Sequence, residues 1–444
     1  MYENQLTRRK FLSIAAAGTL VILLDNCGVE STKPISKSTP SPQSSSKLPQ
    51  ILPGSITPAG LGVNIHFTEP RQGEAEMITK AGFGFVRIDF PWSDIERQKG
   101  VYNFSIQENL VKALAEQGIL ALAVLAYGNP LYDNSSAPFH IGPNTKEVQQ
   151  AFARFAAEAA AKFKGHRVIW EIWNEPNNPD FWQPKPNADN YMELAKVTIA
   201  AIRRVDTDVS IIAPAITTYP QNLDFWNFLE RCFAHHLLEQ IDAVSIHPYR
   251  YNKLPETVVD DYQRLHTLIA SYPTKSKKSI PIISSEWGYP VTTMISKDFQ
   301  AALLVRQFLI NSMSGIPLST WYDWRDDGQD PQDIQNTFGI LDWNYQRKPA
   351  YFGVQTLTKE LNGYHFIKRQ SLPSKGDFAV LFANDKRQKL VMWTVDKPHS
   401  IRLPVDTPSV MVVSMTGEKR SVTPTHGALE IELTGSPQYL ITCA

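Results

Sequence analysis

Cysteine is scarce in this chain of 444 residues, which contains only Cys27, Cys232 and Cys443. Three well-separated thiols do not make a disulfide framework or a zinc site, so the fold must depend on its apolar core. Cys232 follows an amphipathic stretch and is expected to be buried, because free cysteine is among the most buried residue types. A bridge between Cys232 and Cys443 stays open if the chain reaches an oxidising compartment.

An excess of charge of either sign is also lacking, since Lys and Arg together number 44 and Asp and Glu together number 44. Without a basic excess, nothing in the composition indicates a nucleic-acid partner. Signatures of metal and nucleotide sites are missing as well. No Gly-rich phosphate turn follows the first predicted strand, and the acidic loop around Asp326 lacks the spacing of a calcium loop. We therefore expect no metal and no cofactor.

Long apolar runs are absent except near the N-terminus, where Phe11 to Leu24 follows the pair Arg8-Arg9. This stretch is shorter than the about 20 residues that a comfortable membrane span needs. Paired arginines directly before Phe-Leu resemble a twin-arginine signal, so residues 1–27 are predicted to direct export. Cys27 stands where a bacterial lipoprotein is acylated, although the residues before it are not the usual small ones. We expect a periplasmic, extracellular or envelope-anchored protein, with any membrane attachment through the N-terminus only; an uncleaved anchor and ordinary cleavage nearby are the alternatives.

Residues 28–55 are rich in Ser and Pro and poor in apolar side chains, which predicts a disordered linker. From residue 56 to residue 362, apolar runs alternate with amphipathic helical patterns. The predicted strands are Leu61–Phe67, Gly84–Phe90, Ile119–Tyr127, Arg167–Trp173, Val209–Ala213, Ile241–His247, Ile280–Glu286 and Leu318–Asp323. The predicted helices lie near 71–81, 105–117, 146–164, 188–205, 222–237, 257–271, 298–314 and 349–361. Strict alternation predicts parallel strands, and eight such units predict a (β/α)8 TIM barrel, an α/β fold, in preference to an open doubly wound sheet.

Residues 363–444 have a different pattern, with short alternating segments separated by turn residues. The predicted strands here are Phe378–Phe382, Lys389–Val395, Ser409–Ser414, Leu429–Leu433 and Gln438–Thr442. This pattern predicts a small C-terminal antiparallel β-sandwich domain. Packing support for the barrel and a binding module of its own are both open as its role.

Active sites of such barrels lie at the C-terminal ends of the strands, and the polar candidates fall there. They are His66, Arg87, Asn174, Glu175, His247, Tyr249 and Glu286, with the aromatic residues Trp321 and Trp324. Two tryptophan-rich stretches each present a glutamate after an apolar run, namely Glu175 in Trp170–Asn177 and Glu286 in Ile282–Gly288. A glycosidase needs two carboxyl groups facing each other across a cleft. Indole rings around them, Trp287 included, offer flat apolar surface on which a sugar can stack.

Trp173-Asn174-Glu175-Pro176 on the fourth predicted strand, with Glu286 on the seventh, resembles clan A of the glycoside hydrolases, in particular the group around families 39 and 5. Three further segments resemble that group: Arg87–Trp92, Ser245–Tyr249 and Trp321–Trp324. The resemblance covers residues 58–362. The Asn-Glu-Pro motif alone is weak, but its combination with the second glutamate and His-Pro-Tyr, each on the expected strand, is specific.

The resemblance implies a retaining glycosidase that cleaves β-glycosidic bonds, with Glu175 as general acid/base and Glu286 as nucleophile. Such enzymes hold the two carboxyl groups about 5–5.5 Å apart and pass through a covalent glycosyl-enzyme. Glu286 would be kept ionised by hydrogen-bond donors, with Arg87 as its charge partner and Tyr249 as a hydroxyl donor.

The remaining implied roles concern the sugar. Asn174 would hold the 2-hydroxyl, His247 would orient the acid/base, and Trp321 or Trp324 would form the floor under the sugar ring. His66 has two open readings: it lines the sugar site, or it is a hydrogen-bonded histidine at the barrel mouth.

Several acidic residues nearby are expected to be structural. Glu171 is two residues before Trp173 on the same strand, and Asp89 is read as a partner of Arg87 or of the following loop. The loop with Asp326 is read as loop structure or as hydrogen-bond partners for a sugar. The expected partner is an oligo- or polysaccharide and the expected state a monomer. A transglycosylase and a non-catalytic carbohydrate-binding barrel are the alternative functions.

Overall fold

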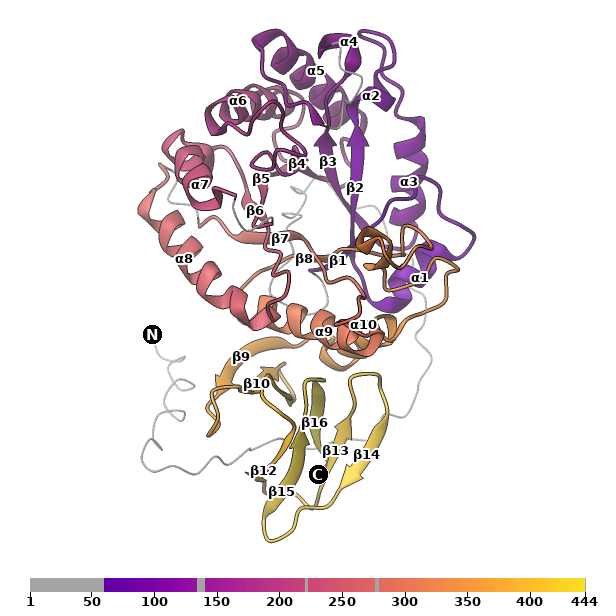
Figure 1. Cartoon of the computed structure of the whole chain (residues 1–444), viewed down its shortest axis with the longest axis vertical. Coiled ribbons are helices and arrows are strands. Elements are labelled where there is room, and N and C mark those ends of the chain that lie inside the picture. Colours follow the sequence, from indigo (N-terminus) through magenta and orange to yellow (C-terminus); the bar gives the residue numbers. More distant parts are fainter. Residues whose placement is uncertain (1–59, 134–139, 220–222, 276–278, 444) are drawn as a thin grey trace, which may run out of the picture.

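The computed structural model describes residues 60–133, 140–219, 223–275 and 279–443, which form a barrel followed by antiparallel β-sheets (Figure 1). The predicted export signal, Cys27 and the predicted linker lie outside the described residues. Within the described ranges, every helix is too short or too polar to cross a membrane.

Eight parallel strands close into a barrel in the order β1 to β8, as predicted. They are β1 (Leu61–Asn64), β2 (Phe85–Pro91), β3 (Leu120–Ala126), β4 (Ile169–Ile172), β5 (Ser210–Thr217), β6 (Ala243–His247), β7 (Ile282–Trp287) and β8 (Ser319–Trp321). Pairing of β1 with β8 completes the ring. Because all strands run the same way, their C-terminal ends meet at one mouth, where we expected the site.

Helices surround the strands on the outside (Figure 1). The principal ones are α1 (Glu74–Ala81), α3 (Ser105–Ala115), α5 (Lys146–Lys162), α6 (Ala188–Val205), α7 (Phe225–Ala234), α8 (Val258–Ser271), α9 (Lys297–Met313) and α10 (Pro349–Leu361). Each corresponds to a predicted helix. Short elements that the periodicity did not indicate are α2 (Trp92–Ile95), α4 (Pro130–Asp133), η2 (Leu237–Glu239), η3 (Pro255–Thr257) and η4 (Ile334–Thr337). A single turn is too short to show a helical period.

Helix α5 illustrates how the sequence sets these elements. Thr145 caps its N-terminus by accepting a hydrogen bond from the backbone of Val148. Phe152, Phe155 and Ala159 lie at helical spacing on the buried face. Their burial against the barrel supplies most of the stabilisation, because propensity alone is weak.

The C-terminal strands form one six-stranded antiparallel sheet, in the order β14-β13-β16-β11-β10-β9, and a separate pair, β12-β15. Their bounds are β9 (His365–Gln370), β10 (Asp377–Ala383), β11 (Gln388–Thr394), β12 (His399–Pro404), β13 (Ser409–Val413), β14 (Lys419–Val422), β15 (Ala428–Leu433) and β16 (Gln438–Cys443). The predicted sandwich is therefore confirmed. Strands β9, β12 and β14 escaped prediction because β9 and β14 are mostly exposed and β12 has only one fully buried residue, so their alternation is faint.

The sheets pack against the barrel through a shared core that includes Phe378, Trp393 and Tyr439. Cys232 is buried, as expected, and is a free thiol.

Candidate active site

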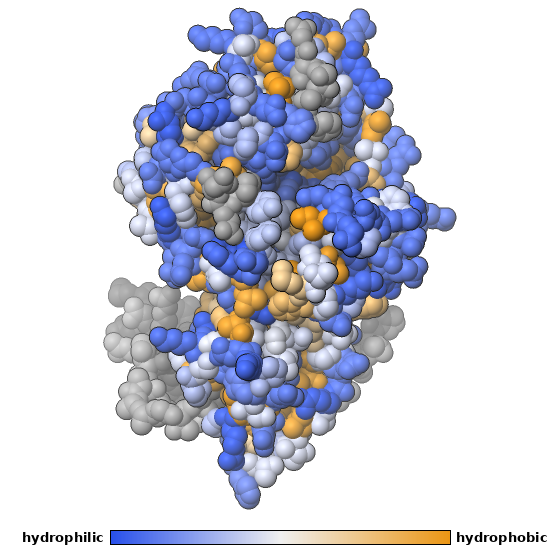
Figure 2. Space-filling model, in the orientation of Figure 1, coloured by the Kyte–Doolittle hydropathy of each residue, from blue (hydrophilic) through white to orange (hydrophobic). Residues whose placement is uncertain are grey.

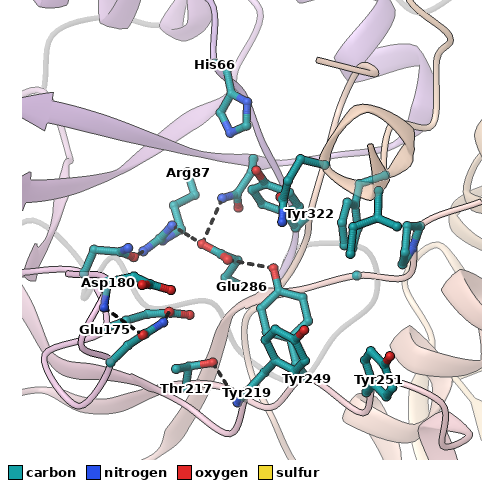
Figure 3. Close-up of a pocket in the computed structure, with 18 of the residues that line it drawn as sticks. His66, Arg87, Glu175, Asp180, Thr217, Tyr219, Tyr249, Tyr251, Glu286 and Tyr322 are labelled. Atoms are coloured by element: carbon teal, nitrogen blue, oxygen red, sulfur yellow. Dashed lines mark hydrogen bonds and ion pairs between the residues drawn. The ribbon is translucent and has the colours of Figure 1, made fainter. Parts of the chain in front are cut away.

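The C-terminal ends of the strands enclose a pocket of about 440 Å³ (Figure 3). Side chains in a strand alternate between its two faces, so strand ends can direct selected residues into this space. Of the sequence-predicted site residues, those that line it are His66, Arg87, Asn174, Glu175, Tyr249 and Glu286. His247 lies directly behind them and is fully buried.

Arg87, at the centre of β2, connects the two glutamate-bearing strands. Its Nη1 donates to Glu286 at 2.7 Å, and its Nη2 donates to Asn174 at 2.9 Å. Its Nε donates to Glu171 of β4 at 2.7 Å, and the nearby Asp89 interacts with Arg87 through its charge. Arg87 and Glu171 are buried, and a buried charge is tolerated only when it is paired in this way.

Glu286 is surrounded by donors. Tyr249 donates its hydroxyl to Oε1 at 2.7 Å, and Asn64 lies 3.4 Å from Oε2 (Figure 3). Burial alone would raise the pKa of this carboxyl group, but His247 and Arg87 and then the Tyr249 hydroxyl outweigh it and lower the pKa below its ordinary value. Glu286 is therefore an ionised carboxylate at neutral pH, as a nucleophile must be.

Glu175 follows β4 in a left-handed backbone conformation, with φ of 47°, a conformation rare for residues other than glycine. Its backbone N–H donates to Ala215 of β5 at 3.0 Å. The carboxyl group contacts His247 Nδ1 at 2.9 Å and accepts from Asn178 at 2.9 Å. One oxygen of Glu175 and one of Glu286 lie within 4.8 Å of each other. The two carboxyl groups therefore face the same part of the pocket.

His66 lines the pocket and contacts Asp327 at 2.7 Å and Asp323 at 3.6 Å. Burial would lower its pKa, but these two carboxylates raise the pKa to about 9, so the imidazole is charged at neutral pH. Nearby, Asp89 accepts a hydrogen bond from the hydroxyl of Tyr127 at 3.2 Å.

Two clusters of described residues could in principle ligate a metal ion, Glu175–His247–Glu286 and His66–Asp323–Asp327. In the first, the guanidinium of Arg87 already contacts Glu286. In the second, the two carboxylates hold a proton on His66 that a metal ion would have to displace.

The tryptophans are not where we expected them. Trp287, Trp321 and Trp324 are fully buried and do not line the pocket. Trp287 follows the pocket-facing Glu286 directly, so strand alternation turns its ring outwards. Tyr322, the residue after Trp321, lines the pocket and offers the ring surface that we had assigned to an indole.

Sequence reasoning also missed several lining residues, which belong to the end of β1 or to the segments that follow the strands. They include Asn64, Tyr127, Asn178, Asp180, Tyr219, Tyr251, Met294, Ile334 and Phe338. Tyr322 could have been found by counting two-residue alternation along the eighth strand. The loop residues carry no comparable periodic signal.

A family model described as Cellulase (glycosyl hydrolase family 5) matches residues 58–327. The chain belongs to this family of clan A glycoside hydrolases. It is therefore a glycosidase whose fold and paired carboxyl groups agree with that membership.

Known relatives of this family 5 chain include proteins named beta-xylosidase and endoglucanase. The chain is 22% identical over 365 residues to a "Beta-xylosidase" of Caldicellulosiruptor saccharolyticus, which covers 75% of this chain and 72% of the relative. It is 28% identical over 192 residues to an "Endoglucanase" of Clostridium saccharobutylicum, and the match covers 42% of this chain and 35% of the relative. A family 39 glycoside hydrolase from the gut symbiont Bacteroides cellulosilyticus superposes with a TM-score of 0.76 at 25% identity, over 88% of this chain and 81% of that chain.

Proposed function

We propose that this glycosidase cleaves β-glycosidic bonds of an oligo- or polysaccharide with net retention of configuration. The observation that carries the proposal is the separation of at most 4.8 Å between oxygens of Glu175 and Glu286. Retaining glycosidases hold their carboxyl groups about 5–5.5 Å apart, whereas inverting ones need about 6.5–9.5 Å to admit a water molecule.

In the first step of the proposed mechanism, Glu286 attacks the anomeric carbon and forms a glycosyl ester. Glu175 donates its proton to the glycosidic oxygen, which leaves with the bonding electron pair as an alcohol. The positive charge that develops on the sugar ring faces the ionised Glu286, while Arg87 and Tyr249 hold that carboxylate in place.

In the second step, Glu175, now a carboxylate, removes a proton from water as the water attacks the anomeric carbon. The ester bond to Glu286 breaks, which returns the nucleophile and leaves Glu175 protonated. Asn174 is held by Arg87 beside the reaction centre, where its amide can reach the sugar 2-hydroxyl. His247 contacts Glu175 through Nδ1 and fixes its orientation through both steps.

Azide separates the two roles. In Glu175→Ala, azide should replace the base-activated water, accelerate turnover of an aryl β-glycoside and give a β-glycosyl azide. In Glu286→Ala, azide should occupy the space of the lost carboxylate and give the α-azide. Proton NMR of the first product anomer of the wild-type protein tests retention directly, and an α-anomer formed first would refute the proposal.

A transglycosylase shares this mechanism up to the intermediate and differs only in its acceptor. Product profiles at high acceptor concentration would distinguish the two activities. For substrate, the names of the relatives favour β-xylosides and β-glucosides as the first compounds to test.

We also propose that the enzyme is exported, on the strength of the Arg8-Arg9 pair before an apolar stretch. Replacement of both arginines by lysine should retain the protein in the cytoplasm, and cell fractionation would show this. Unchanged export of that variant would contradict the proposal.

A further inference from the structure

The pocket has two chemically different sides. Every charged residue that lines it belongs to, or follows, β1, β2, β4 or β7: these are His66, Arg87, Asp89, Glu175, Asp180 and Glu286. No charged side chain of the pocket comes from the lining segments after β5, β6 and β8. The same is true of the loop that follows Glu286 of β7. Apart from Glu286 on β7, the charged lining residues therefore lie on the side of β1 to β4.

Exposed hydrophobic side chains gather on the other side. Eight large hydrophobic residues of the described chain are exposed, and four of them line this pocket: Tyr219, Tyr251, Met294 and Ile334. We call these four residues the apolar wall. Met294 is 81% exposed, the highest value among the eight. Hydrophobic residues also border the hollow at the centre of this face (Figure 2). Such a cluster at a functional cleft indicates a ligand that covers it.

The wall is built to present apolar surface. Tyr219 and Tyr251 stack on each other, with ring centroids 5.6 Å apart and planes 19° from parallel. The hydroxyl of Thr292 accepts hydrogen bonds from the backbones of Met294 and Ile295, which fixes the turn that holds Met294 outwards. The two acceptor positions of that hydroxyl are thereby engaged within the turn.

The wall begins close to the residue that, under the proposed function, protonates the leaving group. Glu175 must reach the glycosidic oxygen to protonate it, and its backbone is bonded to Ala215 of β5. Thr217, at the end of β5, and Tyr219 just beyond it continue from that point and line the same pocket. A leaving group protonated by Glu175 therefore faces the segment that begins the wall.

We propose that the apolar wall binds the leaving group, and that the preferred leaving group is an apolar alkyl or aryl aglycone in place of a second sugar. This inference rests on the proposed function, which assigns Glu175 to the leaving-group side of the glycosidic bond. It specifies the substrate class as glycosides of hydrophobic alcohols or phenols.

Hexyl and methyl β-D-xylosides, with the matching β-D-glucosides, test the proposal. Hexanol and methanol are alcohols of similar acidity, so a difference in rate reports binding of the aglycone and not bond breaking. We expect the hexyl compound to be hydrolysed with a kcat/KM at least tenfold higher than the methyl compound and above that of xylobiose or cellobiose. A ratio near one, or preference for the disaccharide, overturns the inference.

A paired variant locates the effect. Met294→Gln/Ile334→Gln should lower the hexyl-to-methyl ratio of kcat/KM at least fivefold, because the hexyl compound loses its contact with the wall. Val101→Gln/Ile106→Gln, which changes two exposed hydrophobic residues outside the pocket, is the matched control and should leave the ratio unchanged. A ratio unaffected by the first pair refutes the role of the wall.

Measuring the binding of both glycosides to the Glu286→Gln variant separates aglycone recognition from catalysis. Calorimetry with hexyl and methyl β-D-xyloside requires no turnover, and at least tenfold tighter binding of the hexyl compound supports the inference. Equal affinity, or no binding of the hexyl compound, contradicts it. An inverted first product from the wild-type enzyme would refute the proposed retaining mechanism but not the preference for a hexyl aglycone. The measured affinities would still decide that preference.

Discussion

Two buried arginines, one at the pocket and one between the barrel and the β-sheets, use the same chemistry for different ends. Arg306 on α9 donates Nε and Nη2 to the two oxygens of Glu256, each at 2.7 Å, and Trp393 of β11 donates to the same carboxylate at 2.8 Å. Arg87 distributes its donors over Glu171, Glu286 and Asn174. One network is closed on itself, and the other ends at an open cavity.

The difference shows that a buried ion pair does not by itself mark a catalytic centre. Glu256 has both oxygens engaged by donors that belong to the fold, so it stabilises the contact between barrel and β-sheets. Glu286 lines a cavity large enough for a sugar and lies within 4.8 Å of a second acid. Access and a partner acid, not burial, distinguish the reactive carboxylate.

Replacing Glu286 by Gln should reduce turnover more than any other single substitution in either network. Loss of a nucleophile lowers kcat by a factor on the order of 10⁴ or more. The amide keeps the size of the side chain, so thermal unfolding followed by circular dichroism should show a folded protein. Turnover within tenfold of the wild type would break the distinction between the two networks.

Glu256→Gln is the matched change in the closed network, and it should affect stability instead of activity. Arg306 would be left buried without its charge partner, which costs about 3–5 kcal/mol of unfolding free energy. Urea titration would measure that loss, and kcat below the unfolding transition should stay within a few-fold. A variant as stable as the wild type would show that the ion pair contributes little.

Much of the eight-stranded barrel could be predicted because its sequence pattern is repeated and strong. Helix α5 combines a capping Thr145 with buried Phe152 and Phe155 at helical spacing, and β3 is a nearly continuous apolar run. Glu175 and Glu286 could be placed at one mouth because parallel strands of a barrel share their C-terminal end.

The facing of individual aromatic residues was harder to predict. Trp287 was assigned to the pocket by residue type and Trp321 by the family resemblance, whereas alternation along each strand decides facing. The apolar wall was missed for another reason. Met294 lies in the loop after β7 and Ile334 begins η4 after β8, and nothing in their own segments indicates that the two converge on one pocket.

Tyr249→Phe should move the acid limb of the pH–activity profile. The folded-state pKa of Glu286 lies below its ordinary value, so activity that needs its ionised form persists above that depressed pKa and falls as the pH drops through it. A hydrogen bond to a charged group contributes about 1.5–3 kcal/mol, and its loss should raise the acid-limb pKa by roughly one to two units. An acid limb of kcat/KM at the wild-type position would show that Arg87 and His247 suffice.

His66→Gln should give the smallest effect, and that effect should depend on pH with the opposite sign. Asp327 and Asp323 raise the pKa of His66 to about 9 from an ordinary value of 6.5. Its contribution to stability is therefore complete below pH 6.5 and is lost as the pH rises towards 9. The imidazole is 41% exposed, so solvent screens the pair and the effect stays small. Urea midpoints of the two proteins should differ at pH 6 and converge by pH 10; a difference that persists at pH 10 would assign the role of His66 to packing and not to charge.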